Sequence, residues 1–237
     1  MQTKGYAATS ATTPLAPFAF NRRTPGPKDV HVTIDFCGIC HSDIHFSRNE
    51  WGMTTYPAVP GHEIIGRVVS VGKDVKNFKN GQRVGVGCFV NSCGKCASCR
   101  GGHENYCEVG PTMTYASLEP DGVTSTFGGY SRDIVVDEHF VLSIPEGLDP
   151  AGAAPLLCAG ITTYSPLREV GLKKGSRVAV MGLGGLGHMG VKLAASFGAE
   201  VTVLSRSPEK EADARRLGAG EFVLTSTAGA LDALETA

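Results

Sequence analysis

The feature that most constrains the fold of this chain is a cluster of four cysteines within 15 residues: Cys93, Cys96, Cys99 and Cys107. Without an export signal at the N-terminus, such a cluster indicates metal binding before disulfide bonding. Four thiolates on one loop form a closed tetrahedral zinc site, which is structural because no position stays open. The competing interpretation is an iron–sulfur cluster, but in bacterial ferredoxin motifs the fourth cysteine follows after about three residues and precedes proline. Here seven residues intervene and Glu108 follows, which favours zinc.

The composition excludes several classes of protein. With 22 basic and 23 acidic residues the net charge is −1, which gives no basic surface for nucleic acid and disfavours a zinc-ribbon nucleic-acid binder. The content of 42% hydrophobic and 19% charged residues predicts a folded globular chain. No apolar run approaches the roughly 18 residues that span a bilayer, so we expect no membrane partner. We expect a cytoplasmic location.

The pattern of the chain changes near residue 150. Before it, apolar residues alternate in short runs between turn residues, which predicts strands at 30–36, 63–71, 83–90 and 133–136. After it, the pattern is βαβαβ, with strands at 177–181, 201–204 and 222–224 and helices at 186–197 and 208–217. Residues 228–237 begin another helix-compatible stretch. The sequence therefore predicts a β domain over 1–153 and an α/β domain over 154–237.

A glycine-rich turn joins the first predicted parallel strand to its helix. It contains Gly182, Gly184, Gly185, Leu186 and Gly187. The pattern G-x-G-x-x-G is weak alone, but between a strand and a helix it is the dinucleotide-binding fingerprint, with the pyrophosphate at the helix N-terminus.

The residue that ends the second parallel strand selects the dinucleotide. Here it is Ser205, where an NAD enzyme requires a carboxylate for the ribose 2′-hydroxyl. The hydroxyls of Ser205 and Ser207, with Arg206 and Lys210, suit a 2′-phosphate instead. The sequence therefore predicts NADP(H), and Glu209 is the one discordant residue.

Three further stretches carry metal-ligand side chains: Cys40, the pair His62 and Glu63, and Cys158. Taken singly, each has an ordinary explanation, because a buried cysteine acts as a small hydrophobe and a lone histidine is more often a hydrogen-bonded core residue. The same explanation fits Cys37 and Cys88.

Taken together, these stretches resemble the zinc-dependent medium-chain alcohol dehydrogenases. The matching motifs are Gly61-His62-Glu63 followed by Gly66 and Gly72, Gly-Ile-Cys-His-Ser-Asp at 38–43, and the four-cysteine loop. Residues 40–45 and 154–164 are most similar to the cinnamyl-alcohol-dehydrogenase-like branch. The resemblance covers essentially the whole chain. It implies a GroES-like β-barrel catalytic domain followed by a partial Rossmann domain.

The resemblance also implies the roles of single residues. It makes Cys40, His62 and Cys158 the ligands of a catalytic zinc, with Glu63 as a fourth, exchangeable ligand. Asp43 is expected to orient the His62 ring as a hydrogen-bonded partner.

Further roles follow for residues near the substrate and cofactor. Ser42 is expected to take the alcohol proton and His45 to receive it through the nicotinamide ribose. His41 is expected at the pyrophosphate, Thr162 at the nicotinamide and Trp51 in the substrate pocket. The ordinary alternatives are turn polarity for Ser42 and His45 and a packed surface aromatic for Trp51.

These expectations define an oxidoreductase with two Zn²⁺ per chain that transfers hydride between NADP(H) and a primary alcohol or aldehyde of the aromatic or medium-chain class. The alternative is a non-catalytic zinc-binding fragment or interaction module derived from such an enzyme. From residue 177 to 237 there is room for one βαβαβ half of a Rossmann domain, since a βαβ unit takes about 30 residues. We therefore expect a C-terminally truncated chain, in which the family's homodimer contact is doubtful.

Overall fold

The computed structural model describes residues 1–119 and 121–231. The chain divides into two compact units, Met1–Cys158 and Ala159–Ala237. The first unit is rich in β-strands and the second is α/β, which confirms the predicted fold class. Ala154 and Leu157 belong to the first of these compact units, because they pack with Ile65 in a buried cluster.

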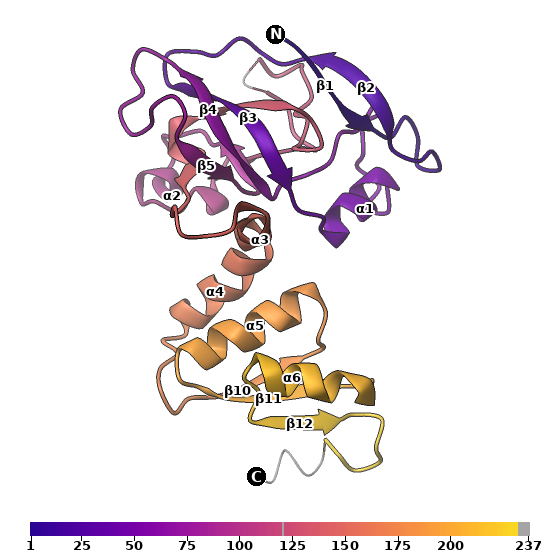
Figure 1. The fold of residues 1–237 in the computed structure, drawn as a ribbon. Coiled ribbons are helices and arrows are strands. Elements are labelled where there is room, and N and C mark those ends of the chain that lie inside the picture. Colours follow the sequence, from indigo (N-terminus) through magenta and orange to yellow (C-terminus); the bar gives the residue numbers. More distant parts are fainter. Residues whose placement is uncertain (120, 232–237) are drawn as a thin grey trace. The chain divides into compact units, whose positions relative to one another are not determined.

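A five-stranded antiparallel sheet forms the core of the first unit (Figure 1). Its strand order is β8 (Asp133–Asp137), β3 (Asp29–Cys37), β4 (Ile64–Val71), β5 (Arg83–Val86) and β9 (Val141–Ser143). Alternate side chains point to one face, where Val30, Val32, Ile64, Val84 and Val136 are fully buried. The sheet curls into a half-barrel.

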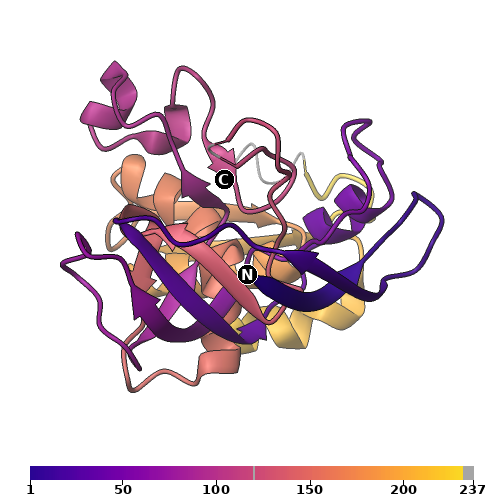
Figure 2. The same cartoon turned by 90° about the horizontal axis from the view of Figure 1, so that it is seen from above.

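Shorter elements surround this sheet. The strands are β1 (Gln2–Ala7), β2 (Ala16–Asn21), β6 (Phe89–Asn91) and β7 (Thr112–Met113). The helices are α1 (His41–Ser47), α2 (Ala97–Arg100), η1 (Glu104–Tyr106), η2 (Glu138–Phe140), α3 (Pro150–Ala153) and η3 (Ala154–Leu157). The segment with α2 and η1 projects away from the sheet (Figure 2).

The predicted strand over 83–90 is in fact two strands, β5 and β6. They are separated at Gly87 and Cys88, where the chain passes close to another segment. A Cβ at Gly87 would lie only 2.8 Å from the carbonyl oxygen of Leu157. The close approach of η3 therefore interrupts a run whose apolar pattern is continuous.

The second unit contains a three-stranded parallel sheet in the order β10 (Arg177–Met181), β11 (Glu200–Ser205) and β12 (Glu221–Leu224). The helices are α4 (Ala159–Glu169), α5 (Gly185–Ser196), η4 (Pro208–Lys210) and α6 (Glu211–Leu217). Val191 and Ala194 of α5 and Ala214 of α6 pack on Val201 and Val203 of β11. This arrangement confirms the predicted βαβαβ order. The helix expected over 208–217 begins as the 3₁₀ turn η4, and Gly218, at φ +113°, ends it.

The stretch that follows β12 differs from its prediction. Residues 228–231 form a turn, and the rest of the helix-compatible stretch, 232–237, lies outside the described residues. Within the described part of the chain, no helix is both long enough and apolar enough to cross a membrane.

A largely buried ion pair fixes the start of β3. Asp29 is 7% exposed, and both of its carboxylate oxygens accept hydrogen bonds from the Arg23 guanidinium, one of them at 2.8 Å. Burial alone would raise the pKa of Asp29, but the hydrogen bonds from Arg23 and from the Gly26 N–H outweigh it and hold that pKa below its usual range. The pair therefore stabilises the folded state.

We expect Asp29→Asn to lower the free energy of unfolding of the first unit by about 2 kcal/mol, because charge-assisted hydrogen bonds are lost. Since the folded-state pKa is depressed, this contribution is complete above the unfolded pKa of about 4 and disappears as pH falls through the folded pKa. Urea denaturation followed by the fluorescence of Trp51, the single tryptophan, measures it.

Asp35→Asn is the matched control on the same strand. Asp35 pairs at 3.5 Å with Arg67, whose side chain is 53% exposed, so we expect a loss of at most about 0.5 kcal/mol. Equal losses in the two variants would contradict a stabilising role for the Asp29 pair.

Candidate functional site

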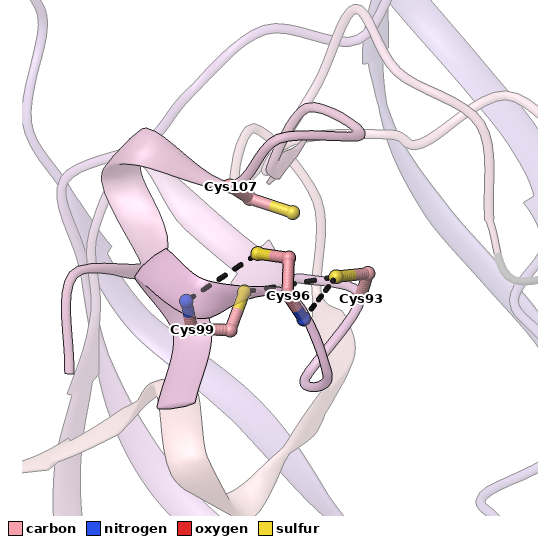
Figure 3. Close-up of side chains that lie close together, drawn as sticks. All are labelled: Cys93, Cys96, Cys99 and Cys107. Carbon is pink, nitrogen blue, oxygen red and sulfur yellow. Dashed lines mark hydrogen bonds between the residues drawn. The ribbon is translucent and has the colours of Figure 1, made fainter. Parts of the chain in front are cut away.

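The four predicted structural ligands lie on the projecting loop. Cys96 is the N-cap of α2, Cys99 lies within α2, and Cys107 follows η1. Their three sulfur atoms and that of Cys93 lie within 4.8 Å of one another, and Figure 3 shows the four side chains directed towards one another. Backbone N–H groups, from Lys95 and Cys96 to Cys93 and from Cys99 to Cys96, lower the pKa of these two thiols. Four converging thiols with such donors fit a tetrahedral metal ion.

One acidic side chain ties this loop to its surroundings, and a second closes the loop on itself. Glu104 Oε1 lies 2.6 Å from Nε2 of His139 in η2, and Glu108 Oε1 accepts a hydrogen bond from the Ala97 N–H at 3.2 Å. The contact of Glu104 with His139 could not be expected from the sequence, because the two residues are far apart in the chain and neither is in a motif.

The dispersed set of predicted ligands also converges, entirely within the first unit. Cys40 is the N-cap of α1, His62 and Glu63 precede β4, and Cys158 follows η3. One ligand atom from each lies within 4.8 Å of the others. His62 and Glu63 are only 4% and 3% exposed. The structure thus brings the four side chains together, while their role as metal ligands stays a prediction.

Asp43 is the centre of a hydrogen-bond network behind His62. Its Oδ1 accepts from the Gly61 N–H at 2.9 Å and lies 3.1 Å from Nδ1 of His62. Its Oδ2 accepts from the Cys40 N–H at 2.9 Å and from the Tyr130 hydroxyl at 3.2 Å. Because an ionised carboxylate only accepts, His62 Nδ1 must donate, which leaves Nε2 as the ligand atom.

The electrostatics of this network favour an ionised Asp43. Burial raises its pKa, but the hydrogen bonds from His62 and two backbone N–H groups outweigh burial and lower it. Burial lowers the pKa of His62, yet the bonds to Asp43 and Cys158 raise it to about 10. Burial and the Asp43 charge raise the pKa of Tyr115 and Tyr130, so both phenols stay protonated.

Cys88 lies beside this set, although the sequence analysis read it as a plain hydrophobic residue. Its thiol and that of Cys158 are hydrogen-bonded, which lowers the pKa of Cys88 and, with burial, raises that of Cys158. Cys37 fits its ordinary explanation, since it packs against the sheet core and burial raises its pKa to about 12. Of the two cysteines, Cys88 is the one that lies at the break between β5 and β6, and this position places its thiol beside Cys158.

The residues predicted near substrate and proton transfer gather on and after α1. Ser42 and His45 stand three positions apart on this helix and therefore share a face. His45 Nδ1 is hydrogen-bonded to Glu50, and its ring centroid lies 5.8 Å from that of His41 and 5.5 Å from that of Trp51. Trp51 is 49% exposed. The structure brings these side chains together without testing their roles.

The predicted dinucleotide residues occupy the second unit. Gly182 follows β10 at φ +84°, and Gly184 is the N-cap of α5. A Cβ at Gly187 would lie 2.0 Å from the Gly182 carbonyl oxygen, so this position excludes any side chain. Leu186 is partly exposed in the first turn of α5, and Thr162 is exposed on α4.

The residues predicted to select the dinucleotide follow β11. Ser205 ends that strand, and its hydroxyl accepts a hydrogen bond from the Ser207 N–H at 3.1 Å. Lys210 Nζ donates to the Leu183 carbonyl in the glycine turn at 3.2 Å. Arg206 and Glu209 are exposed. Lys210 also borders a cavity of about 460 Å³ together with His188, Lys192 and the ion pair of Arg216 with Asp213.

Residues 26–146 match the family model described as the alcohol dehydrogenase GroES-like domain. The chain belongs to this alcohol dehydrogenase family. Among curated relatives, NADP-dependent alcohol dehydrogenase C of Mycobacterium bovis is 57% identical over 221 residues, which are 93% of this chain and 64% of the relative. A probable cinnamyl alcohol dehydrogenase of rice (Oryza sativa subsp. japonica) is 53% identical over 98% of this chain and 63% of its own length. The chain thus spans somewhat less than two thirds of these relatives.

Solved structures of the family share the fold. Cinnamyl alcohol dehydrogenase 4 of Sorghum bicolor superimposes with a TM-score of 0.94 at 47% identity, covering 98% of this chain and 67% of that chain. A cinnamyl alcohol dehydrogenase of Helicobacter pylori, in complex with NADP(H), gives a TM-score of 0.91 at 47% identity and covers 94% and 65%. These matches confirm the resemblance to the cinnamyl-alcohol-dehydrogenase-like branch.

Gly61, next to His62, has a backbone that only glycine adopts easily and no room for a side chain. Its φ is +103°, and a Cβ would lie within 2.8 Å of Tyr130 and of the Cys37 sulfur. We expect Gly61→Ala to lower the free energy of unfolding by about 2 kcal/mol more than Gly81→Ala. Gly81 has a similar φ of +81° but nothing within 4 Å, so it reports backbone strain alone. Urea denaturation tests this, and equal losses would contradict the packing argument.

Proposed function

We propose that this chain supplies the metal-binding and adenosine-binding parts of a zinc-dependent, NADP(H)-linked alcohol dehydrogenase. The observation that carries the proposal is the convergence of two cysteines, one histidine and one glutamate within 4.8 Å, with Asp43 hydrogen-bonded behind the histidine. The reaction is hydride transfer between the cofactor and a primary alcohol or aldehyde.

The donor set suits a catalytic zinc site. Cys40, His62 and Cys158 would hold the ion, with Glu63 as the exchangeable fourth ligand. Metal binding would displace the Nε2 proton of His62, so that two thiolates and a neutral imidazole balance the charge of Zn²⁺. When bound, zinc supplies Lewis-acid polarisation of the substrate oxygen. The four-cysteine loop would hold a second, structural zinc, because four thiolates leave no position for substrate.

The protein side chains around the set orient the ligands and move a proton. Asp43 accepts a hydrogen bond from the Nδ1–H of His62 and would so direct Nε2 towards the metal position. Ser42 Oγ would accept the proton of the alcohol while its own hydroxyl proton is passed on towards His45. His45 would take up a proton at Nε2 and give its Nδ1 proton to Glu50, whose side chain is 42% exposed. The exposed carboxylate connects this path to solvent.

The second unit provides the dinucleotide residues. The turn from Gly182 to Gly187 and the N-terminus of α5 would hold the pyrophosphate. Ser205, Arg206, Ser207 and Lys210 would hold the 2′-phosphate. When bound, NADP(H) supplies or accepts the hydride.

The proposed substrates are aromatic or medium-chain primary alcohols and aldehydes. The aromatic side chain of Trp51, beside His45, supports a flat substrate. The test is an aldehyde panel that includes cinnamaldehyde, assayed with NADPH and with NADH. Turnover of none of them by a chain loaded with two zinc ions would favour the alternative of a non-catalytic zinc-binding module.

We expect two zinc ions per chain by elemental analysis. Cys40→Ser should remove one ion and abolish any turnover while preserving most of the fold, because Cys40 ends a loop outside the sheet. Cys96→Ser should remove the other ion and destabilise the projecting loop, because a closed structural zinc contributes directly to folding. Iron with acid-labile sulfide, or no more than one metal in fully loaded protein, would refute the assignment.

We also expect NADPH to bind more tightly than NADH. A charge-assisted hydrogen bond contributes about 1.5–3 kcal/mol, so two to the 2′-phosphate give a preference of about a hundredfold or more. Ser205→Asp should reverse most of it, because a carboxylate repels the phosphate and accepts from the ribose 2′-hydroxyl. Ser196→Asp adds the same charge at an exposed position at the end of α5 and is the control. Cofactor fluorescence titration measures both, and equal binding of NADH by the unmodified chain would overturn the assignment.

A further inference from the structure

A short segment, residues 127–131, lies directly against the turn that carries His62. We refer to it as the glycine strap. Its backbone pairs with residues 59–61, which precede His62 in the chain. The Gly128 N–H donates to the Val59 carbonyl at 2.7 Å, and the Tyr130 N–H donates to the Pro60 carbonyl at 2.9 Å. Gly129 N–H donates to Gly61 O at 2.8 Å. The strap therefore holds the chain up to the residue before His62.

The contact between the two backbones is as close as sterics allow. A Cβ at Gly128 would lie 2.3 Å from the Pro60 carbonyl oxygen, and one at Gly129 would lie 2.4 Å from Ile64 Cγ1. Neither position accepts a side chain. The fourth residue of the strap, Tyr130, carries the side chain that reaches the site.

Tyr130 connects the strap to Asp43. Its hydroxyl lies 3.2 Å from Asp43 Oδ2, while Asp43 Oδ1 holds the His62 ring. The strap thus contacts His62 by two routes, one through the Gly61 backbone and one through the phenol and the carboxylate. Two donors reach Oδ2. One is the Cys40 N–H at the N-terminus of α1, and the other is the Tyr130 hydroxyl from the strap.

Arg22 fixes the strap from its other side. This side chain is 6% exposed, and its guanidinium donates to Phe127 O, to Gly128 O at 2.9 Å and to Ser131 Oγ at 2.8 Å. Burial lowers its pKa to about 10, so it stays charged at neutral pH. A buried cation with its donors satisfied by carbonyl oxygens holds these atoms at fixed positions.

We propose that Tyr130 is a positioning residue for the metal-binding imidazole of His62, acting through Asp43. The inference rests on the zinc assignment proposed above. With the phenol in place, the carboxylate has donors on both oxygens and one orientation. Without it, Oδ2 keeps the Cys40 N–H and Asp43 keeps its hydrogen bond with Tyr115, but the donor from the strap is lost and the carboxylate is held less firmly, together with the ring it orients.

The size of the effect follows from the distance to the metal. Loss of a group bonded directly to a metal-ligating histidine lowers metal affinity about 10- to 100-fold. Tyr130 acts one bond further away. We therefore expect Tyr130→Phe to lower zinc affinity at the Cys40, His62 and Cys158 set about 3- to 10-fold.

The experiment measures zinc transfer from the intact chain to a chromophoric chelator, with the two sites assigned by Cys40→Ser and Cys96→Ser. Tyr130→Phe should weaken zinc binding at the Cys40 set only, and the four-cysteine site serves as the internal reference. Cobalt(II) substitution adds a second readout, because a reoriented imidazole changes the visible absorption of the site. If the hydroxyl had only a structural role, its removal would change neither the zinc affinity nor the cobalt spectrum.

Tyr56→Phe is the matched control. The Tyr56 hydroxyl donates to the Ser47 carbonyl at 2.9 Å, so this variant loses a similar hydrogen bond without touching Asp43. If Tyr130→Phe and Tyr56→Phe have the same zinc affinity and the same cobalt spectrum, the role of Tyr130 is overturned while the proposed function still stands. A parent chain that binds no zinc at the Cys40 set would overturn the proposed function, and this inference with it.

Discussion

One buried negative charge organises the candidate site. A carboxylate that is 2% exposed, as Asp43 is, destabilises a fold unless donors surround it. Here the donors come from three separate segments: the start of α1, the turn before β4, and the glycine strap. Each segment is held in place by its bond to the same ion. The positions of Cys40 and His62 therefore depend on Asp43, although Asp43 is not among the predicted ligands.

The parts of the molecule that could be predicted from sequence are those whose signal is local. The alternating run at 30–36 predicts β3, and the apolar run at 177–181 followed by glycines predicts β10 and the start of α5. The place of Ser205 at the end of β11 is predicted in the same way, from the short apolar run at 201–204. In each case a few neighbouring residues determine both conformation and chemistry. The ligand set needed more, since only a family resemblance related Cys158 to Cys40.

The features that could not be predicted depend on contacts between distant residues. Tyr130 and Arg22 carry no motif, and their importance appears only when the strap lies against residues 59–61. Cys88 looks like any cysteine in a strand, because nothing local shows that η3 passes beside it. The same approach divides the predicted strand into β5 and β6. Tertiary packing, which no periodicity encodes, decides all of these cases.

The two cysteine-containing sets differ in how the chain must fold to assemble them. The four-cysteine set closes only short loops, so its entropic cost is small and it can gather in a nascent or largely unfolded chain. The Cys40, His62 and Cys158 set spans nearly the whole first unit, and it forms only after β3, β4 and η3 have come together. On the proposed assignment, a metal ion would therefore reach the two sets at different times: early on the projecting loop, and at the last step of folding on the dispersed set.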